Sequence, residues 1–138
     1  ISTHLFAGGN DNPPVENDYV TSTVSLSKTK IKAGTSGAIL ISLKPKNGIH
    51  INLQPSIEVK IDNSPAITPI GAPEIPKNSK KQFVDPDKPI RQAFKLSGTA
   101  KPGTVDVTGT VTYYYCSDTD GWCSKYKQPI HLKIIVTK

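Results

Sequence analysis

Apolar and polar residues alternate along most of this chain from Tyr19 onward. Alternation with a period of two is typical of β-strands that bury one face, and a short continuous apolar run is typical of a strand buried on both faces. No stretch shows helical spacing over three turns, and most prolines and glycines fall between the apolar segments. The sequence therefore predicts an all-β protein, built as an antiparallel β-sandwich. Strands are expected at residues 20–26, 38–43, 49–53, 57–61, 93–96, 105–116 and 130–136.

Two regions lack this pattern. Residues 1–18 are rich in Gly, Asn, Asp and Pro, and we expect them to be a flexible leader or linker ahead of one domain at 19–138. Residues 65–89 carry many prolines, and we expect a long irregular loop there, of the kind that is usually functional or disordered.

Composition limits the function classes. The net charge is +6, but the lysines are scattered, Arg91 is the single arginine, and aromatic residues are not interleaved with the lysines as a base-stacking surface requires. We therefore expect no nucleic-acid binding. Ile39-Leu40-Ile41 and Ile134-Ile135-Val136 are the longest aliphatic runs, far below the ~20 residues of a membrane span. Because the chain begins at Ile1 and has no methionine, we expect a processed or excised piece of a longer protein, one that can be membrane-anchored.

The candidate chemistry lies in the two cysteines, Cys116 and Cys123, which flank a polar turn containing Gly121. Such a turn folds the chain back, so the two thiols can meet without help from distant residues. The pair is then either redox-active or a structural clip in a hairpin, and the spacing alone does not separate these alternatives. A zinc site with His131 is a weaker alternative, because a closed site needs four ligands. We expect no metal and no other cofactor.

The neighbours of the pair are assigned by strand parity. Cys116 shares a face with the hydroxyl-rich side of strand 105–116, so we expect it to be accessible. Tyr113 and Tyr115 lie on the apolar face and are expected to pack in the core. Tyr114 is expected at the surface, where it is a candidate for docking a partner.

Three loop residues complete the predicted site. Trp122 is expected either to shield a reactive sulfur or to form part of a docking surface. Asp118 and Asp120 would raise the pKa of a neighbouring thiol, or are simply turn-forming aspartates.

Two patches of the sequence resemble a known family. They are Asn47-Gly48-Ile49-His50-Ile51-Asn52 followed by Pro55, and the segment from Val111 to Cys123. Together they resemble the amino-terminal periplasmic domain of the thiol:disulfide interchange protein DsbD and related disulfide-corrector-like domains, over roughly residues 19–138.

The resemblance implies an immunoglobulin-like sandwich in a periplasmic or otherwise extracytoplasmic location. It implies a protein-disulfide reductase domain whose redox couple is Cys116 and Cys123. Electrons would come from a thioredoxin-like protein or domain and pass to an exported disulfide isomerase or cytochrome-maturation protein. The family's cap loop would match residues 80–84, with Phe83 as the lid, and the alternative is that Phe83 is a loop anchor packed into the core. The alternative function is a non-catalytic sandwich for binding or assembly, with a structural hairpin disulfide.

Overall fold

The computed structural model describes residues 15–80 and 82–138, and none of them is helical. They form an all-β structure, as the sequence predicted. The strands are β1 (Val15–Glu16), β2 (Val20–Leu26), β3 (Lys30–Lys32), β4 (Ser36–Pro45), β5 (Ile49–Ile51), β6 (Glu58–Ile61), β7 (Ile67–Glu74), β8 (Ile90–Leu96), β9 (Gly103–Ser117) and β10 (Cys123–Thr137).

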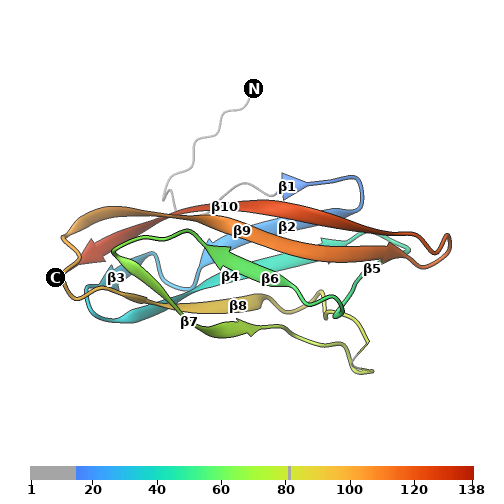
Figure 1. Cartoon of the computed structure of the whole chain (residues 1–138), viewed down its shortest axis with the longest axis horizontal. Helices are drawn as coiled ribbons and strands as arrows, with labels where there is room; N and C mark the ends of the chain where they lie inside the picture. The colour runs from blue at the N-terminus through green and yellow to red at the C-terminus, as the bar shows by residue number, and fades with distance from the viewer. Residues whose placement is uncertain (1–14, 81) are drawn as a thin grey trace.

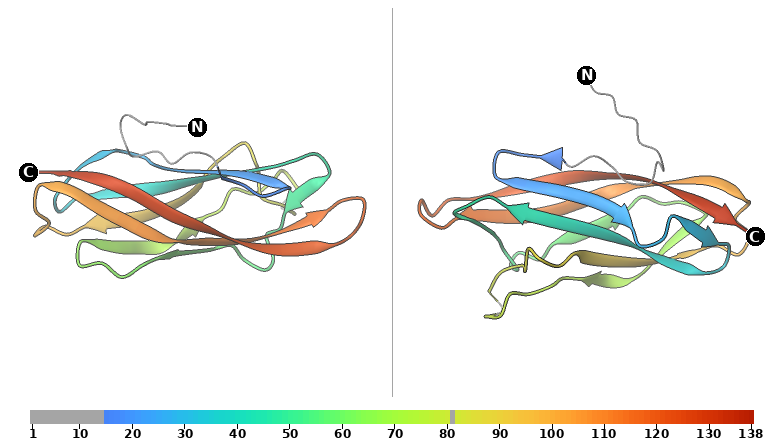
Figure 2. Two further views of the ribbon diagram at one scale, coloured as in Figure 1. Left: turned by 90° about the horizontal axis from the view of Figure 1, so that it is seen from above. Right: turned by 180° about the vertical axis from the view of Figure 1, so that it is seen from behind.

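The strands form two sheets that pack face to face (Figures 1 and 2). One sheet has the order β1-β2-β4-β8-β7, and the other has the order β3-β10-β9-β5, with β6 also paired to β9. All neighbours are antiparallel except β3, which runs parallel to β10. The order β2-β4-β8-β7 corresponds to the A-B-E-D sheet of an immunoglobulin-like domain, and β10-β9-β6 corresponds to its G-F-C strands. The predicted immunoglobulin-like antiparallel β-sandwich is therefore confirmed.

The core lies between the two sheets and explains the alternation in the sequence. In β2 the burial pattern alternates strictly, and in β10 every second residue from Gln128 to Val136 is buried. Tyr113, Phe94 and Ile39 are among its largest fully buried side chains. A buried polar pair joins the sheets through this core, because the Ser22 hydroxyl lies 2.9 Å from Oε1 of Gln128.

The predicted irregular loop at 65–89 is wrong for residues 67–74, which form the edge strand β7. An edge strand tolerates prolines, since their missing N–H groups need not pair with a neighbouring strand. Pro69 pairs in register with Phe94, and the register shifts between Ile70 and Glu74. The side chain of Gln92 stabilises this irregularity by donating to the Gly71 carbonyl at 3.2 Å.

The predicted leader, residues 1–18, lies largely outside the described residues. Within its last four positions, Val15 and Glu16 pair with Ser22 and Thr21 of β2, and Oδ1 of Asn17 accepts the backbone N–H of Val20 at 2.7 Å. The described residues contain no helix long and apolar enough to cross a membrane.

The β9–β10 hairpin runs the length of the sandwich and ends in the turn that carries the cysteines (Figure 1). The two further views agree that this turn and the C-terminus lie at opposite ends of the long axis (Figure 2). The turn is therefore at the periphery of the molecule, within reach of another protein.

Candidate functional site

The two cysteines form a disulfide at the turn end of the β9–β10 hairpin. Cys116 is the register partner of Cys123, and their Cα atoms are 4.0 Å apart. The adjacent pair is hydrogen-bonded, since the Ser117 N–H donates to the Trp122 carbonyl at 2.9 Å. Cys116 and Cys123 thus occupy a non-hydrogen-bonded pair, the position where opposite side chains approach most closely. The predicted meeting of the two sulfurs is confirmed.

The turn beyond the disulfide is fixed by its own hydrogen bonds. The Gly121 N–H donates to the Ser117 carbonyl at 3.1 Å, and Gly121 has a φ of 76°, which favours glycine. The Asp120 N–H donates to the Ser117 hydroxyl at 3.1 Å, and the Asp118 N–H donates to the Gly48 carbonyl at 2.7 Å. The last contact attaches the tip of the hairpin to the turn that precedes β5.

The two cysteine residues differ in exposure. Cys123 is exposed, whereas Cys116 is only 6% exposed. The prediction that Cys116 is accessible is therefore wrong. Strand parity does place it on the outer face of the sheet, but β5 pairs with β9 at its edge and puts His50 on the same face, directly opposite Cys116. Residues far away in the sequence therefore lie beside Cys116 on a face that local alternation left open.

Asn52 makes the closest polar contact to the disulfide. Its Nδ2 lies 3.0 Å from Sγ of Cys116 and donates to it. The backbone of Asn52 is held independently, because its N–H donates to the Tyr114 carbonyl at 2.8 Å. An amide donor is thereby aimed at the buried sulfur of the pair.

The rings of His50 and Phe83 are in contact on the same side. The ring of Phe83 stacks on the ring of His50 with centroids 3.8 Å apart, and Phe83 forms an isolated bridge with Asn52. Nδ1 of His50 is paired with the carboxylate of Asp118 at the hairpin tip. Phe83, the predicted lid residue, therefore contacts the residue that is the register partner of Cys116, while Lys81 of the predicted cap loop lies outside the described residues.

Trp122 lies on the other face of the hairpin. Successive residues of a strand point to opposite faces, so Trp122 points away from the side that carries Cys123. Its ring packs against Tyr19 at a centroid distance of 4.8 Å and against Tyr115 at 6.0 Å. The prediction that Trp122 shields the sulfur pair is wrong, because its contacts are with this inner aromatic cluster.

Tyr113 and Tyr115 pack inside as predicted, with exposures of 0% and 6%. Burial raises the pKa of Tyr113, an effect only partly offset by the hydrogen bond from Nδ2 of Asn17 to its hydroxyl. Tyr114 lies on the outer face beside the disulfide and is half-buried, and Asp120 is exposed at the tip.

A hollow of about 380 Å³ lies on the outer face of the sheet, and its lining begins two residues from each cysteine, at Tyr114 and Lys125. It extends from Tyr114 across three adjacent strands. Its lining residues are Glu58 and Lys60 of β6, Thr110, Thr112 and Tyr114 of β9, and Lys125 and Lys127 of β10.

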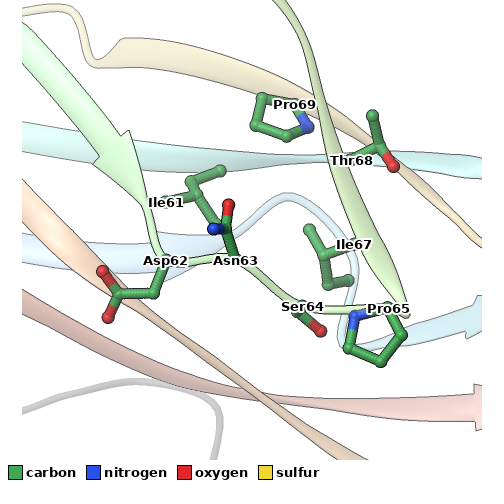
Figure 3. A pocket seen from close by; sticks show the side chains of 8 residues that line it. All are labelled: Ile61, Asp62, Asn63, Ser64, Pro65, Ile67, Thr68 and Pro69. Atoms are coloured by element: carbon green, nitrogen blue, oxygen red, sulfur yellow. The ribbon is translucent and has the colours of Figure 1, made fainter.

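A second hollow, of about 470 Å³, lies at the end of the sandwich away from the hairpin tip, where β6 leads into β7 (Figures 1 and 3). Asp62 is the single ionisable residue among those that line it, and its side chain points away from Ile67 (Figure 3). Oδ2 of Asp62 accepts a hydrogen bond from the Thr108 hydroxyl at 2.8 Å. This hollow therefore offers no group of reactive side chains.

The residues around the disulfide do not form a metal site. No group of three His, Cys, Asp or Glu residues within 15–80 and 82–138 could hold a metal ion. Nε2 of His131, the ligand of the zinc alternative, lies 3.7 Å from Asp106 on the exposed part of the sheet.

Two residues at the site were not predicted as site residues. His50 and Asn52 belong to the Gly-Ile-His-Ile-Asn patch that carried the family resemblance, and each contacts a residue more than sixty positions away along the chain. Their shared parity, two positions apart, was the available signal that they lie on one face.

The chain matches no protein-family model, and no curated protein matches it. The solved structures that are similar to it include the following two. The GAE domain of yeast GGA1 is 12% identical, with a TM-score of 0.42, and the match covers 88% of this chain and 98% of that one. AggA, the major subunit of aggregative adherence fimbriae type I from Escherichia coli, is 10% identical, with a TM-score of 0.40, and the match covers 91% of this chain and 100% of that one.

Proposed function

We propose that this domain is an extracytoplasmic thiol-disulfide exchange module, a protein-disulfide reductase domain of the DsbD type, which relays electrons through Cys116 and Cys123. The observation that carries the proposal is the asymmetry of the disulfide: Cys123 is an exposed residue, whereas Cys116 is buried and its sulfur lies against an amide donor. A relay needs one sulfur that a partner can reach and one that leaves readily.

The exchange begins at Cys123. The thiolate of a thioredoxin-like donor attacks Sγ of Cys123, a mixed disulfide forms between donor and domain, and Sγ of Cys116 leaves as a thiolate. Leaving is faster when the departing thiolate is stabilised. The Nδ2 group of Asn52 is placed to supply that stabilisation, since hydrogen bonds to charged acceptors are the stronger ones.

The second step completes the transfer. A second thiolate of the donor attacks the donor's own sulfur in the mixed disulfide and displaces Cys123. The donor ends as a disulfide, and the domain ends as two thiols after taking up two protons from water. The reduced pair then passes the two electrons to an exported acceptor, a disulfide isomerase or cytochrome-maturation protein, by the same steps in reverse.

The reduction potential tests this function against the alternative of an inert clip in a binding or assembly domain. A relay disulfide equilibrates with glutathione at a potential above about −300 mV, whereas structural disulfides usually lie below that value. We expect the full chain, titrated in glutathione redox buffers and analysed by thiol alkylation and mass spectrometry, to give a potential above this limit. A potential below it would overturn the proposal.

Trapping tests the order of attack. A reduced thioredoxin that keeps only its attacking cysteine is mixed with the oxidised domain, and the mixed disulfide is mapped by peptide mass spectrometry. We expect the link at Cys123 with Cys116 free. A link at Cys116 would refute the assigned order, and the absence of any adduct would favour the inert clip.

A further inference from the structure

The outer-face hollow beside the disulfide is lined by more positive than negative charge. Lys125 and Lys127 of β10 face Glu58 and Lys60 of β6 across β9, and all four charged residues are exposed. Within the described parts of the chain, none of the three lysines forms an ion pair, whereas Lys133, farther along the same face, is paired with Asp106 at 2.9 Å. Of the lysines of β10, the two that lie nearest the disulfide, Lys125 and Lys127, are thus the ones without a carboxylate partner.

Two of these lysines follow Cys123 along the same face of β10. Cys123, Lys125 and Lys127 are successive residues on one face of β10. Because side chains on one face of a strand repeat every two residues, each lies about 7 Å from the next. The Cα atom of Lys125 is therefore about 7 Å from that of Cys123, and the Cα atom of Lys127 is about 14 Å from it.

An extended peptide has the same repeat. If its cysteine is joined to Cys123 and its chain runs along the hollow, its side chains two and four residues away lie over Lys125 and Lys127. Carboxylates at those two positions complement the two unpaired ammonium groups. Thr112 is buried at the floor of the hollow, and Tyr114 borders it beside the disulfide.

We propose that this hollow docks an extended acidic segment of the exchange partner, with acidic residues two and four positions from the partner's reacting cysteine. The inference rests on the proposed function, and it adds a preference for partners by charge. Lysine-to-carboxylate pairs on an exposed face also increase the rate of encounter, and they weaken as salt is added.

The probes are acetylated, amidated pentapeptides of sequence Cys-Gly-Glu-Gly-Glu and Glu-Gly-Glu-Gly-Cys, with counterparts that carry Gln or Lys in place of Glu. Their rates of mixed-disulfide formation with the full oxidised chain are measured at low and high salt. Each rate is divided by the rate of the same peptide with an uncharged disulfide, bis(2-hydroxyethyl) disulfide, which removes differences in intrinsic thiol reactivity.

The variant Lys125→Glu with Lys127→Glu is compared with Lys44→Glu with Lys95→Glu. The control changes the net charge equally but at two exposed positions of the other sheet. We expect at least one acidic peptide to react about tenfold faster than its Gln counterpart at low salt. We expect that advantage to be lost in the first variant, kept in the control, and reduced at about 1 M salt, where the Debye length is about 3 Å.

Serine versions of the same peptides separate docking from exchange. We expect them to shift the amide resonances of Thr112, Tyr114 and Lys125 in the oxidised domain and to leave those of Lys44 and Lys95 unchanged. Equal rates for acidic and neutral cysteine peptides, without such shifts, would overturn the docking proposal and leave the relay intact. Shifts at the hollow without exchange by any cysteine peptide would support acidic docking and count against the relay.

Discussion

Asn52 gives the sharpest test of the exchange chemistry, because its amide reaches the sulfur that must leave. In the oxidised domain Nδ2 donates to a neutral disulfide sulfur at 3.0 Å. Once Cys123 is attacked, the same donor faces a thiolate. Hydrogen bonds contribute about 0.5–1.5 kcal/mol between neutral groups and about 1.5–3 kcal/mol when one partner is charged.

The difference, on the order of 1 kcal/mol, is the stabilisation that Asn52 gives to the departing thiolate relative to the starting disulfide. It corresponds to just under one pKa unit of the leaving thiol. We therefore expect Asn52→Ala to slow attack at Cys123 by roughly three- to fivefold. Asn52→Asp keeps the shape but places a carboxylate against the developing negative charge, so it should slow the reaction further.

The assay is the second-order rate of disulfide reduction by reduced glutathione, followed by alkylation of the released thiols across pH 6–9. Asn63→Ala is the control, since Asn63 is an exposed asparagine at the other end of the sandwich. Urea unfolding of the oxidised variants tests whether the fold is kept. We expect it to be kept because the contacts of Asn52 to Tyr114 and Phe83 run through the backbone.

Wild-type rates in both Asn52 variants would refute the reasoning, provided that their unfolding midpoints are unchanged. The amide would then be a structural contact of the oxidised state, with no part in the departure of Cys116. A slowed Asn52→Ala together with an Asn52→Asp that reacts at the wild-type rate would refute the electrostatic argument in particular.

Three further predictions concern stability, measured by urea unfolding. Replacing both Cys116 and Cys123 by serine should cost about 2.5 kcal/mol, the chain-entropy value for a loop of about eight residues, and leave the far-ultraviolet circular dichroism unchanged. Gly109→Ala should cost about 1–3 kcal/mol, because its Cβ would overlap a backbone carbonyl of β6, whereas Gly98→Ala, with nothing within 4 Å, should change little. Because the pKa of Tyr113 is raised, the unfolded chain ionises first, so wild-type stability should fall as the pH rises above about 10, and Tyr113→Phe should reduce that fall.

Much of the fold could be predicted because burial in a sandwich repeats every second residue. The predicted strands at 20–26, 38–43 and 57–61 correspond to β2, β4 and β6. Strands that bury little were missed. In β3 a single buried residue, Ile31, lies between two exposed lysines, and β7 is an edge strand whose prolines and exposed residues gave no alternation.

The site could be predicted only as far as local geometry determines it. The meeting of Cys116 and Cys123 follows from one turn, and it was predicted. The burial of Cys116 depends on β5, some sixty residues earlier, and no local pattern carries that information. The face of Trp122 could have been found by counting alternation back from Cys123, but its position next to the turn concealed that parity.

The position of the disulfide within one sheet bears on what the bond contributes. An immunoglobulin disulfide joins the B and F strands of opposite sheets, so it links the two layers directly. The corresponding strands here are β4 and β9, yet the bond joins β9 to β10, whose register partners continue from the cysteines to Gly103 and Val136. The ladder and the core hold these strands whether or not the sulfurs are joined. Breaking the bond therefore removes a short loop constraint, with the cost of about 2.5 kcal/mol given above, and we expect the domain to stay folded while the bond is opened and closed in the proposed exchange.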